Sequence, residues 1–236
     1  MKKVLGCLRR AVEDFNMIQE GDRIAVGVSG GKDSLTLLKA LRLYQYFSPV
    51  SYELEAITLT MGFDGFDLTK IREFCEELGV RYTVRETLIG KIVFDVRHEK
   101  NPCSLCAKLR RGALHNTAKE LGCNKVALGH HRDDVIETLF LSLFFEGRFN
   151  TFSPVTYLDR KDITLIRPLV YATEADIKGA VKRHQIPVVE NPCPANGCTE
   201  RAHMKRIISS IASEIPNVKD QILTALKNRN NRNLWD

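Results

Sequence analysis

The chain has 236 residues, of which 44% are hydrophobic and 27% charged, with a net charge of +6 at pH 7. This composition is that of a globular protein with one sizeable core, and it excludes a fibrous or disordered chain. No apolar run approaches the roughly 18 residues of a membrane span, and the first residues carry charges where a signal peptide would be apolar. We therefore expect a cytoplasmic protein without a membrane partner, and the positive charge favours a polyanion such as a nucleic acid.

Strand and helix patterns alternate along the chain. Helical spacing of apolar residues predicts a basic amphipathic helix over 2–18, and further helices over 33–48, 68–78 and 103–121. Strands are predicted at 24–28, 54–60, 80–84, 125–128 and 163–166. This alternation is typical of an α/β fold with a doubly wound, mostly parallel sheet.

The same patterns give expected boundaries. We expect a basic helix at 1–20, a main α/β domain over 21–190, and a cysteine loop with helices over 191–236, packed on the same domain. The outer segments are then small helical extensions of a single domain.

A glycine-rich turn, SGGKDS at 29–34, joins the first strand to its helix. Gly30 and Gly31 allow the backbone to approach a ligand, and the N–H groups of the turn favour an anion. The spacing differs from the Walker loop and from GxGxxG. It resembles the PP-loop of the ATP pyrophosphatases, enzymes that split ATP into AMP and pyrophosphate. An ordinary strand-to-helix turn with Ser and Asp caps is the alternative.

The PP-loop resemblance implies a role for each residue of the turn. Ser29, Gly30, Gly31 and Ser34, with the backbone N–H groups, would hold the pyrophosphate end of ATP. Lys32 would add a positive charge, and Asp33 would face Mg²⁺.

Further polar residues follow the other predicted strands. The carboxyl ends of parallel strands meet at one edge of a sheet, so the loops after Val28, Thr60 and Leu128 should converge. The third loop begins the stretch GHHRDDVIETL at 129–139. Its two adjacent histidines point in different directions, which disfavours a shared zinc ion. We expect ATP to contact Thr60, Gly129, His130 and Asp133.

Seven cysteines in a chain without an export signal argue against a disulfide framework. Three of them stand alone and are expected to be buried thiols: Cys7, Cys75 and Cys123. Cys103 and Cys106 share one face at the start of a helix, where the helix N-terminus and nearby basic residues favour thiolates. With Cys193 and Cys198 they could bind zinc or an iron–sulfur cluster, and a thioredoxin-type redox pair is a rival interpretation.

Four motifs occur in order: SGGKDS, PCSLC-x-x-LRRG, LGHHRDD-x-x-ET and RPL at 167–169. Together, over 22 to about 206, they resemble the tRNA 2-thiocytidine synthetase family, also called tRNA-cytidine 2-sulfurtransferases. The resemblance implies an adenine nucleotide alpha hydrolase-like fold, with ATP, Mg²⁺ and a 4Fe-4S cluster held by three cysteines. It also implies tRNA and a sulfur donor such as a cysteine desulfurase as partners, and the sequence leaves a homodimer open.

By this likeness Cys103 and Cys106 are cluster ligands. We expect Cys193 as the third ligand, because the preceding Asn-Pro restricts its loop, and Cys198, after an Asn-Gly turn, is the alternative. A site with three protein thiolates leaves one iron open to carry sulfur. A persulfide on a cysteine is the other route.

The implied reaction is adenylation of the C2 oxygen of a tRNA cytidine and its replacement by sulfur. Catalytic roles would fall to Lys32, Asp33, Cys103 and Cys106. A 2-thiouridine-forming or lysidine-type PP-loop enzyme is an alternative, as is a non-enzymatic ATP-binding iron–sulfur redox sensor.

Basic residues mark a candidate tRNA surface. The expected phosphate contacts are Lys108, Arg110, Arg111, Lys205 and Arg206, with solvated helix faces as the alternative.

Overall fold

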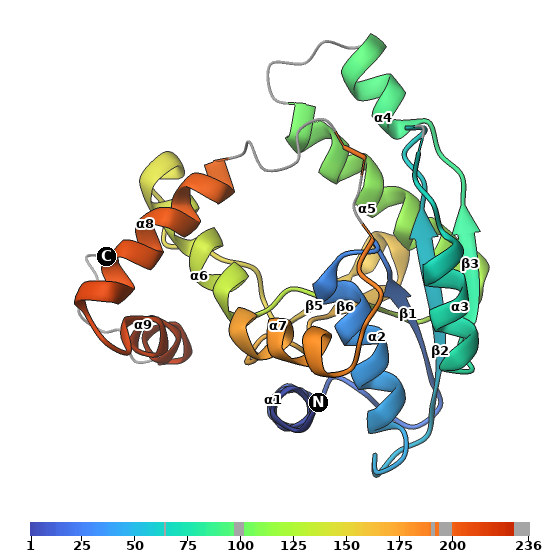
Figure 1. Cartoon of the computed structure of the whole chain (residues 1–236), viewed down its shortest axis with the longest axis horizontal. Helices are drawn as coiled ribbons and strands as arrows, with labels where there is room; N and C mark the ends of the chain where they lie inside the picture. The colour runs from blue at the N-terminus through green and yellow to red at the C-terminus, as the bar shows by residue number, and fades with distance from the viewer. Residues whose placement is uncertain (64, 97–101, 190–191, 194–199, 229–236) are drawn as a thin grey trace. The chain divides into compact units, whose positions relative to one another are not determined.

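The computed structural model describes residues 1–63, 65–96, 102–189, 192–193 and 200–228 and contains a mostly parallel sheet (Figure 1). Within these residues six strands form one sheet in the order β3-β2-β1-β4-β6-β5. They are β1 (Asp22–Gly27), β2 (Tyr52–Leu59), β3 (Arg81–Arg85), β4 (Lys125–Ala127), β5 (Val155–Leu158) and β6 (Ile163–Ile166). Every neighbouring pair is parallel except β5 with β6. The predicted doubly wound α/β fold is confirmed.

Helices lie between and after the strands. They are α1 (Lys2–Asp14), α2 (Lys32–Tyr44), α3 (Thr69–Glu77), α4 (Ile89–Lys91), α5 (Pro102–Glu120), α6 (Arg132–Leu141), α7 (Glu174–Arg183), α8 (Glu200–Glu214) and α9 (Val218–Lys227), with π-helices η1 (Ile92–Val96) and η2 (Ser142–Glu146) and a 3-10 turn η3 (Asp159–Lys161). No helix in the described part of the chain is long and apolar enough to cross a membrane.

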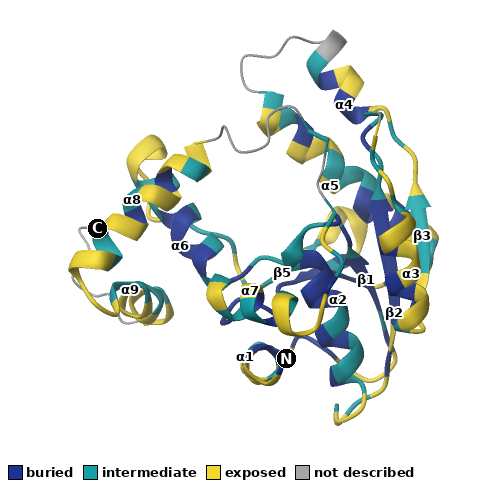
Figure 2. Cartoon of the chain, in the orientation of Figure 1, coloured by how far each residue is buried: buried dark blue, intermediate teal, exposed yellow. Residues whose placement is uncertain are grey.

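The centre of the sheet is buried on both faces. Ile24, Ala25 and Val26 of β1 are fully buried, whereas the edge strand β3 is only half-buried (Figure 2). Ala25 packs in one cluster with Leu114 and Ala118 of α5. The crossovers through α2 and α5 run in opposite directions along the sheet, so right-handed connections put these helices on opposite faces.

Helix α1 has the predicted basic amphipathic character. Val4, Leu8 and Val12 are buried on one face, while Lys2, Lys3, Arg9 and Arg10 are exposed. The helix ends at Asp14 instead of 18, because Asn16 has a positive φ of 46°.

The described chain forms two compact units, one over 1–131 and 153–196 and the other over 132–152 and 197–236. The first contains the sheet with α1 to α5 and α7. In the second, Ile136 of α6 packs on Met204 and Ile208 of α8. In this division α6 and η2 belong to the same unit as the C-terminal helices, whereas the expected domain over 21–190 included them with the sheet.

A buried ion pair links the starts of β1 and β4. Lys125 Nζ lies 2.7 Å from Asp22 Oδ2 and donates to the Met17 carbonyl at 2.9 Å. Asp22 also accepts from the Gln19 N–H and from the Asn124 side chain. Both charged side chains are more than nine-tenths buried, so neither can be rehydrated if the other is removed.

We predict that Lys125→Met lowers the free energy of unfolding by about 3 kcal/mol or more, because it leaves the Asp22 carboxylate buried without a cation. The matched control is Lys119→Met, which removes a lysine from an exposed pair with Asp162 and should cost less than about 1 kcal/mol. Urea denaturation of both variants measures the difference. Equal losses would contradict the importance of the buried pair.

Candidate nucleotide and cysteine site

The PP-loop lies where the strand order of the sheet changes direction. Strand β1 has β2 on one side and β4 on the other. The connection after β1 leads toward one edge of the sheet, and the connection into β4 leads toward the other edge. The carboxyl ends of strands at such a switch point flank the crevice in which ligands bind. The turn 29–34 follows β1 directly, and α2 begins within it, at Lys32.

Gly30 has a conformation that requires glycine. Its φ is +82°, and a Cβ there would lie 3.2 Å from Ile71 Cδ1 and 3.4 Å from Val189. The Val189 N–H donates to the Gly30 carbonyl at 2.9 Å. The segment after α7 therefore packs directly on the turn.

Two serine hydroxyls close the turn on itself. Ser34 Oγ accepts from the Ser29 N–H at 3.1 Å and donates to the Gly31 carbonyl at 3.0 Å. Ser29 Oγ lies 3.2 Å from Ser34 Oγ and 3.4 Å from the Gly31 nitrogen. Because Ser34 is itself buried, these bonds hold the loop in shape before any nucleotide arrives.

Lys32 is held between two carboxylates. Its Nζ lies 2.9 Å from Asp33 Oδ2 and 3.4 Å from Oε1 of Glu174, the first residue of α7. Burial acts to lower the pKa of Lys32, but Asp33 and Glu174 outweigh it and raise the pKa. Lys32 therefore stays positively charged at neutral pH and can attract phosphate.

Asp33 has one oxygen directed away from Lys32. Asp33 Oδ1 lies 3.5 Å from Nε2 of the buried His131, and it is buried without a hydrogen bond among the described residues. A buried carboxylate oxygen of this kind is a ligand that a divalent cation prefers. Sequence reasoning had not assigned roles to His131 and Glu174. The adjacency of His131 to His130 was a signal for the first, and no motif pointed to the second.

The loop after β4 touches the PP-loop backbone. A Cβ on Gly129 would lie 3.0 Å from both the Asp33 carbonyl carbon and the Ser34 nitrogen. The structure thus brings Gly129 to the predicted site. His130 follows it and is half-buried.

Two other residues predicted to bind ATP have other partners. Thr60 bonds with Thr87 on the loop after β3, through its Oγ1 and its carbonyl. Asp133 belongs to the second unit, where its carboxylate lies 2.6 Å from Lys219 Nζ.

Cys103 and Cys106 lie at the start of α5, and Cys193 is close enough in the fold to influence Cys106 electrostatically. Cys103 is exposed, Cys106 is buried and Cys193 is half-buried. Burial raises the pKa of the Cys106 thiol; Arg110 opposes this shift, and Cys193 and Cys103 add to it electrostatically. No three Cys, His, Asp or Glu side chains in the described ranges form a preformed metal site.

Three other described cysteines lie on other elements. Burial raises the pKa of Cys75 to about 12 and that of Cys123 to about 11, so both are inert thiols at neutral pH. Cys7 is half-buried on α1. Cys198 lies outside the described residues.

A short segment connects the cysteine group to the PP-loop. Val189 is bonded to Gly30, and Cys193, four residues later, interacts with Cys106. Four residues span at most about 14 Å between Cα atoms. Cys193 is therefore joined to the nucleotide turn by a short length of chain.

Arg167, the first residue of RPL, also had no predicted role. It is buried, donates to the Ser153 carbonyl at 2.6 Å and lies 3.4 Å from Thr156 Oγ1. Burial lowers its pKa to about 10, with a further contribution from Arg111.

The predicted tRNA contacts are divided between the two units. Lys108 and Arg111 are exposed on α5, and Arg110 is half-buried there. Lys205 and Arg206 are exposed on α8 of the second unit.

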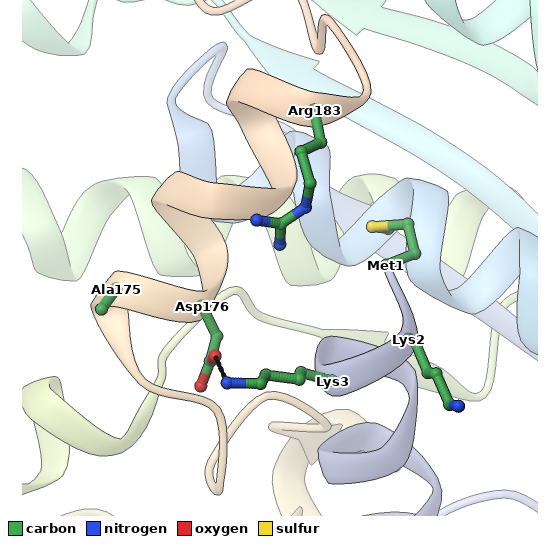
Figure 3. A pocket seen from close by; sticks show the side chains of 6 residues that line it. All are labelled: Met1, Lys2, Lys3, Ala175, Asp176 and Arg183. Atoms are coloured by element: carbon green, nitrogen blue, oxygen red, sulfur yellow. Dashed lines mark ion pairs between the residues drawn. The ribbon is translucent and has the colours of Figure 1, made fainter.

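A separate pocket of about 470 Å³ opens between α1 and α7 (Figure 3). Lys3 and Asp176 face each other across it, 3.9 Å apart. The other lining residues are Met1, Lys2, Ala175 and Arg183. None of these belongs to SGGKDS, so this pocket is not the nucleotide cradle.

Comparison with known proteins defines the class. A family model described as a PP-loop domain matches residues 6–211, so the chain belongs to the PP-loop family. It is 42% identical over 238 residues to the tRNA-cytidine(32) 2-sulfurtransferase of Geobacter sulfurreducens, covering 100% of this chain and 93% of the relative. The enzyme of the same name from Aliivibrio fischeri is 38% identical, over 96% of this chain and 75% of the relative. The chain therefore belongs to the tRNA-cytidine(32) 2-sulfurtransferase family of enzymes, which confirms the resemblance.

Solved structures agree on the fold. The U34-tRNA thiolase NcsA from Methanococcus maripaludis, solved with its [4Fe-4S] cluster, matches with a TM-score of 0.78 and 24% identity, covering 96% of this chain and 77% of that one. The NH3-dependent NAD synthetase of Campylobacter jejuni matches with a TM-score of 0.51 and 16% identity, over 78% and 73%.

We predict that Gly129→Ala strongly weakens ATP binding, because its methyl group would lie 3.0 Å from backbone atoms of Asp33 and Ser34 and would displace the turn. Gly6→Ala is the control, since nothing lies within 4 Å of a Cβ there. Isothermal titration with ATP measures both variants. Wild-type affinity in Gly129→Ala would show that the close contact does not shape the cradle.

Proposed function

We propose that this chain is an ATP-dependent tRNA thiolase that converts a cytidine to 2-thiocytidine. The observation that carries the proposal is the short segment from Val189 to Cys193, which joins the nucleotide turn to the cysteine group. An enzyme that first adenylates a base and then delivers sulfur to it needs both groups within reach of one atom.

The first step is activation of the base. The cytosine O2 attacks the α-phosphorus of ATP; a bond from O2 to phosphorus forms, the bond to the β-phosphate breaks, and pyrophosphate leaves. Lys32 and the backbone N–H groups of the turn neutralise the charge that develops on the leaving group. Asp33 Oδ1 would hold Mg²⁺, which would stabilise the same charge from the other side.

The second step replaces oxygen by sulfur. Sulfur at the oxidation level of sulfide adds to C2, and the original oxygen departs with AMP. Cys103, Cys106 and Cys193 fit a 4Fe-4S cluster as a donor set, since they are three thiols with Arg110 nearby to favour thiolates. Such a cluster would supply a sulfur ligand on the iron that lacks a protein thiolate. A cysteine desulfurase is the proposed source of sulfur; it delivers a persulfide, and a pair of thiols oxidised to a disulfide would supply the two electrons that bring this sulfur to the sulfide level.

Cytidine 32 is the favoured target. The relatives named for cytidine 32 share 38% to 42% identity with this chain, whereas the U34 thiolase shares 24%. In this proposal the tRNA phosphates contact exposed basic residues on two helices: Lys108 and Arg111 on α5, and Lys205 and Arg206 on α8.

Asp33→Asn should reduce tRNA-dependent AMP release by at least about a hundredfold, because it removes the negative charge directed at Mg²⁺ and weakens the hold on Lys32. Glu174→Gln is the comparison, and it should keep more activity because Lys32 retains Asp33. Mass spectrometry of the tRNA nucleosides then tests the product. Normal AMP release in Asp33→Asn, or 2-thiouridine in place of 2-thiocytidine, would contradict the proposal.

The ligand set makes a second prediction. Cys103→Ala, Cys106→Ala and Cys193→Ala should each lose nearly all iron after anaerobic purification, because two thiolates cannot hold the cluster. Cys7→Ala and Cys198→Ala are controls and should keep most of their iron and activity. Loss of iron in Cys198→Ala as well would indicate four protein ligands, a closed site, and a structural or electron-transfer role.

A further inference from the structure

Three phenylalanines are exposed close together in the second unit. Phe144, Phe145 and Phe149 expose 58%, 61% and 53% of their surface, and Arg148, also exposed, lies among them in the sequence FFEGRF. We call these four residues the aromatic platform. Large apolar side chains in such a group mark an interaction site more often than isolated ones do.

The backbone beneath the aromatic platform is fixed. Helix η2 ends at Gly147, which has a φ of 63°, and the N–H groups of Gly147 and Arg148 both donate to the Ser142 carbonyl. Farther along, Thr151 Oγ1 donates to the Val135 carbonyl of α6 at 3.0 Å. The stretch is therefore tied to η2 at one end and to α6 at the other.

Side chains add to this order. The Phe144 ring lies edge-on to Phe140, with ring centroids 5.4 Å apart and an interplanar angle of 85°. Ser142 Oγ donates to Glu146 Oε2 at 3.1 Å, which turns the acid of this stretch toward η2. A ring that is already packed, as Phe144 is, loses little entropy when it binds a flat partner.

We propose that the aromatic platform stacks against unpaired bases of the tRNA while Arg148 contacts a phosphate. This inference rests on the proposed function and names a contact surface for its substrate. Cytosine O2 accepts a hydrogen bond in a base pair, so adenylation at O2 requires an unpaired base. Taking a base out of its stack costs a few kcal/mol, and stacking on aromatic side chains offsets such a cost.

A second copy of the chain fits the aromatic platform less well. Three rings of this exposure offer roughly 300 Å², less than half of the roughly 800 Å² that each partner of a stable complex buries. In a two-fold symmetric dimer the same patch of both subunits forms the contact, which would bring the positively charged Arg148 side chains of the two subunits together. A polyanion removes that repulsion.

The experiment compares tRNA affinity in three variants. The double variant Phe145→Ala with Phe149→Ala should bind tRNA more weakly, with a Kd raised by about tenfold or more, because one or two stacked bases lose their partner. Phe145→Tyr with Phe149→Tyr should restore the affinity, since the ring is kept. Tyr46→Ala, at an exposed aromatic of the first unit, is the control and should bind as wild type. Phe144 is left unchanged because it packs on Phe140.

The dependence on salt separates the two parts of the aromatic platform. The double alanine variant should keep the wild-type slope of log Kd against log salt, because stacking releases no counterions. Arg148→Ala should make that slope shallower by about one. Unchanged affinity in the double alanine variant, with ATP binding and circular dichroism intact, would overturn the inference.

Two further results keep the proposals apart. If the wild-type protein makes 2-thiocytidine but the double alanine variant binds tRNA normally, the inference fails and the proposed function stands. If the wild-type protein neither binds tRNA nor thiolates it, the proposed function fails, and the inference that rests on it fails as well. Sedimentation velocity measures the oligomeric state of the wild-type protein and of the double alanine variant. If the wild-type protein is a dimer and the variant is a monomer, the aromatic platform is a subunit contact, and the inference is overturned.

Discussion

Close approach of backbone segments around the PP-loop is the constraint on which the site depends. Gly30 tolerates no side chain because Ile71 and Val189 occupy the space, and Gly129 tolerates none because the Asp33–Ser34 backbone does. These contacts, with the two serine hydroxyls, leave the N–H groups of the turn and the charged pair Lys32–Asp33 around one small volume. Electrostatic stabilisation of a leaving group is strongest when its donors are positioned in advance, so this packing is part of the chemistry.

The sequence predicted the parts of the fold in which local pattern and tertiary environment agree. Strand β1 is an apolar run buried on both faces, and SGGKDS is short enough for its spacing to define the turn. The antiparallel strand β5 was not predicted, because its four residues VTYL are half exposed and owe their conformation to pairing with β6. A strand that depends on its neighbour leaves little periodicity in the sequence.

Long-range pairing explains what was missed at the site. Glu174 reaches Lys32 from α7, and His131 reaches Asp33 from the loop after β4, across large separations in the chain. The carboxylate of Asp133, predicted to bind ATP, pairs with Lys219 of α9. Residue type and strand position cannot distinguish a ligand-facing acid from one with a lysine partner far along the chain. The gathering of Cys193 with Cys106 also lies beyond local pattern.

The four-residue step from Val189 to Cys193 has a consequence for how this chain can vary. Most surface connections accept inserted residues at small thermodynamic cost. This connection is different, because one end is bonded to the nucleotide turn and the other approaches Cys106. An added residue would change the separation between the two reactive centres as well as the length of a loop. The number of residues between Val189 and Cys193 should therefore be far less free to change than the length of other surface loops.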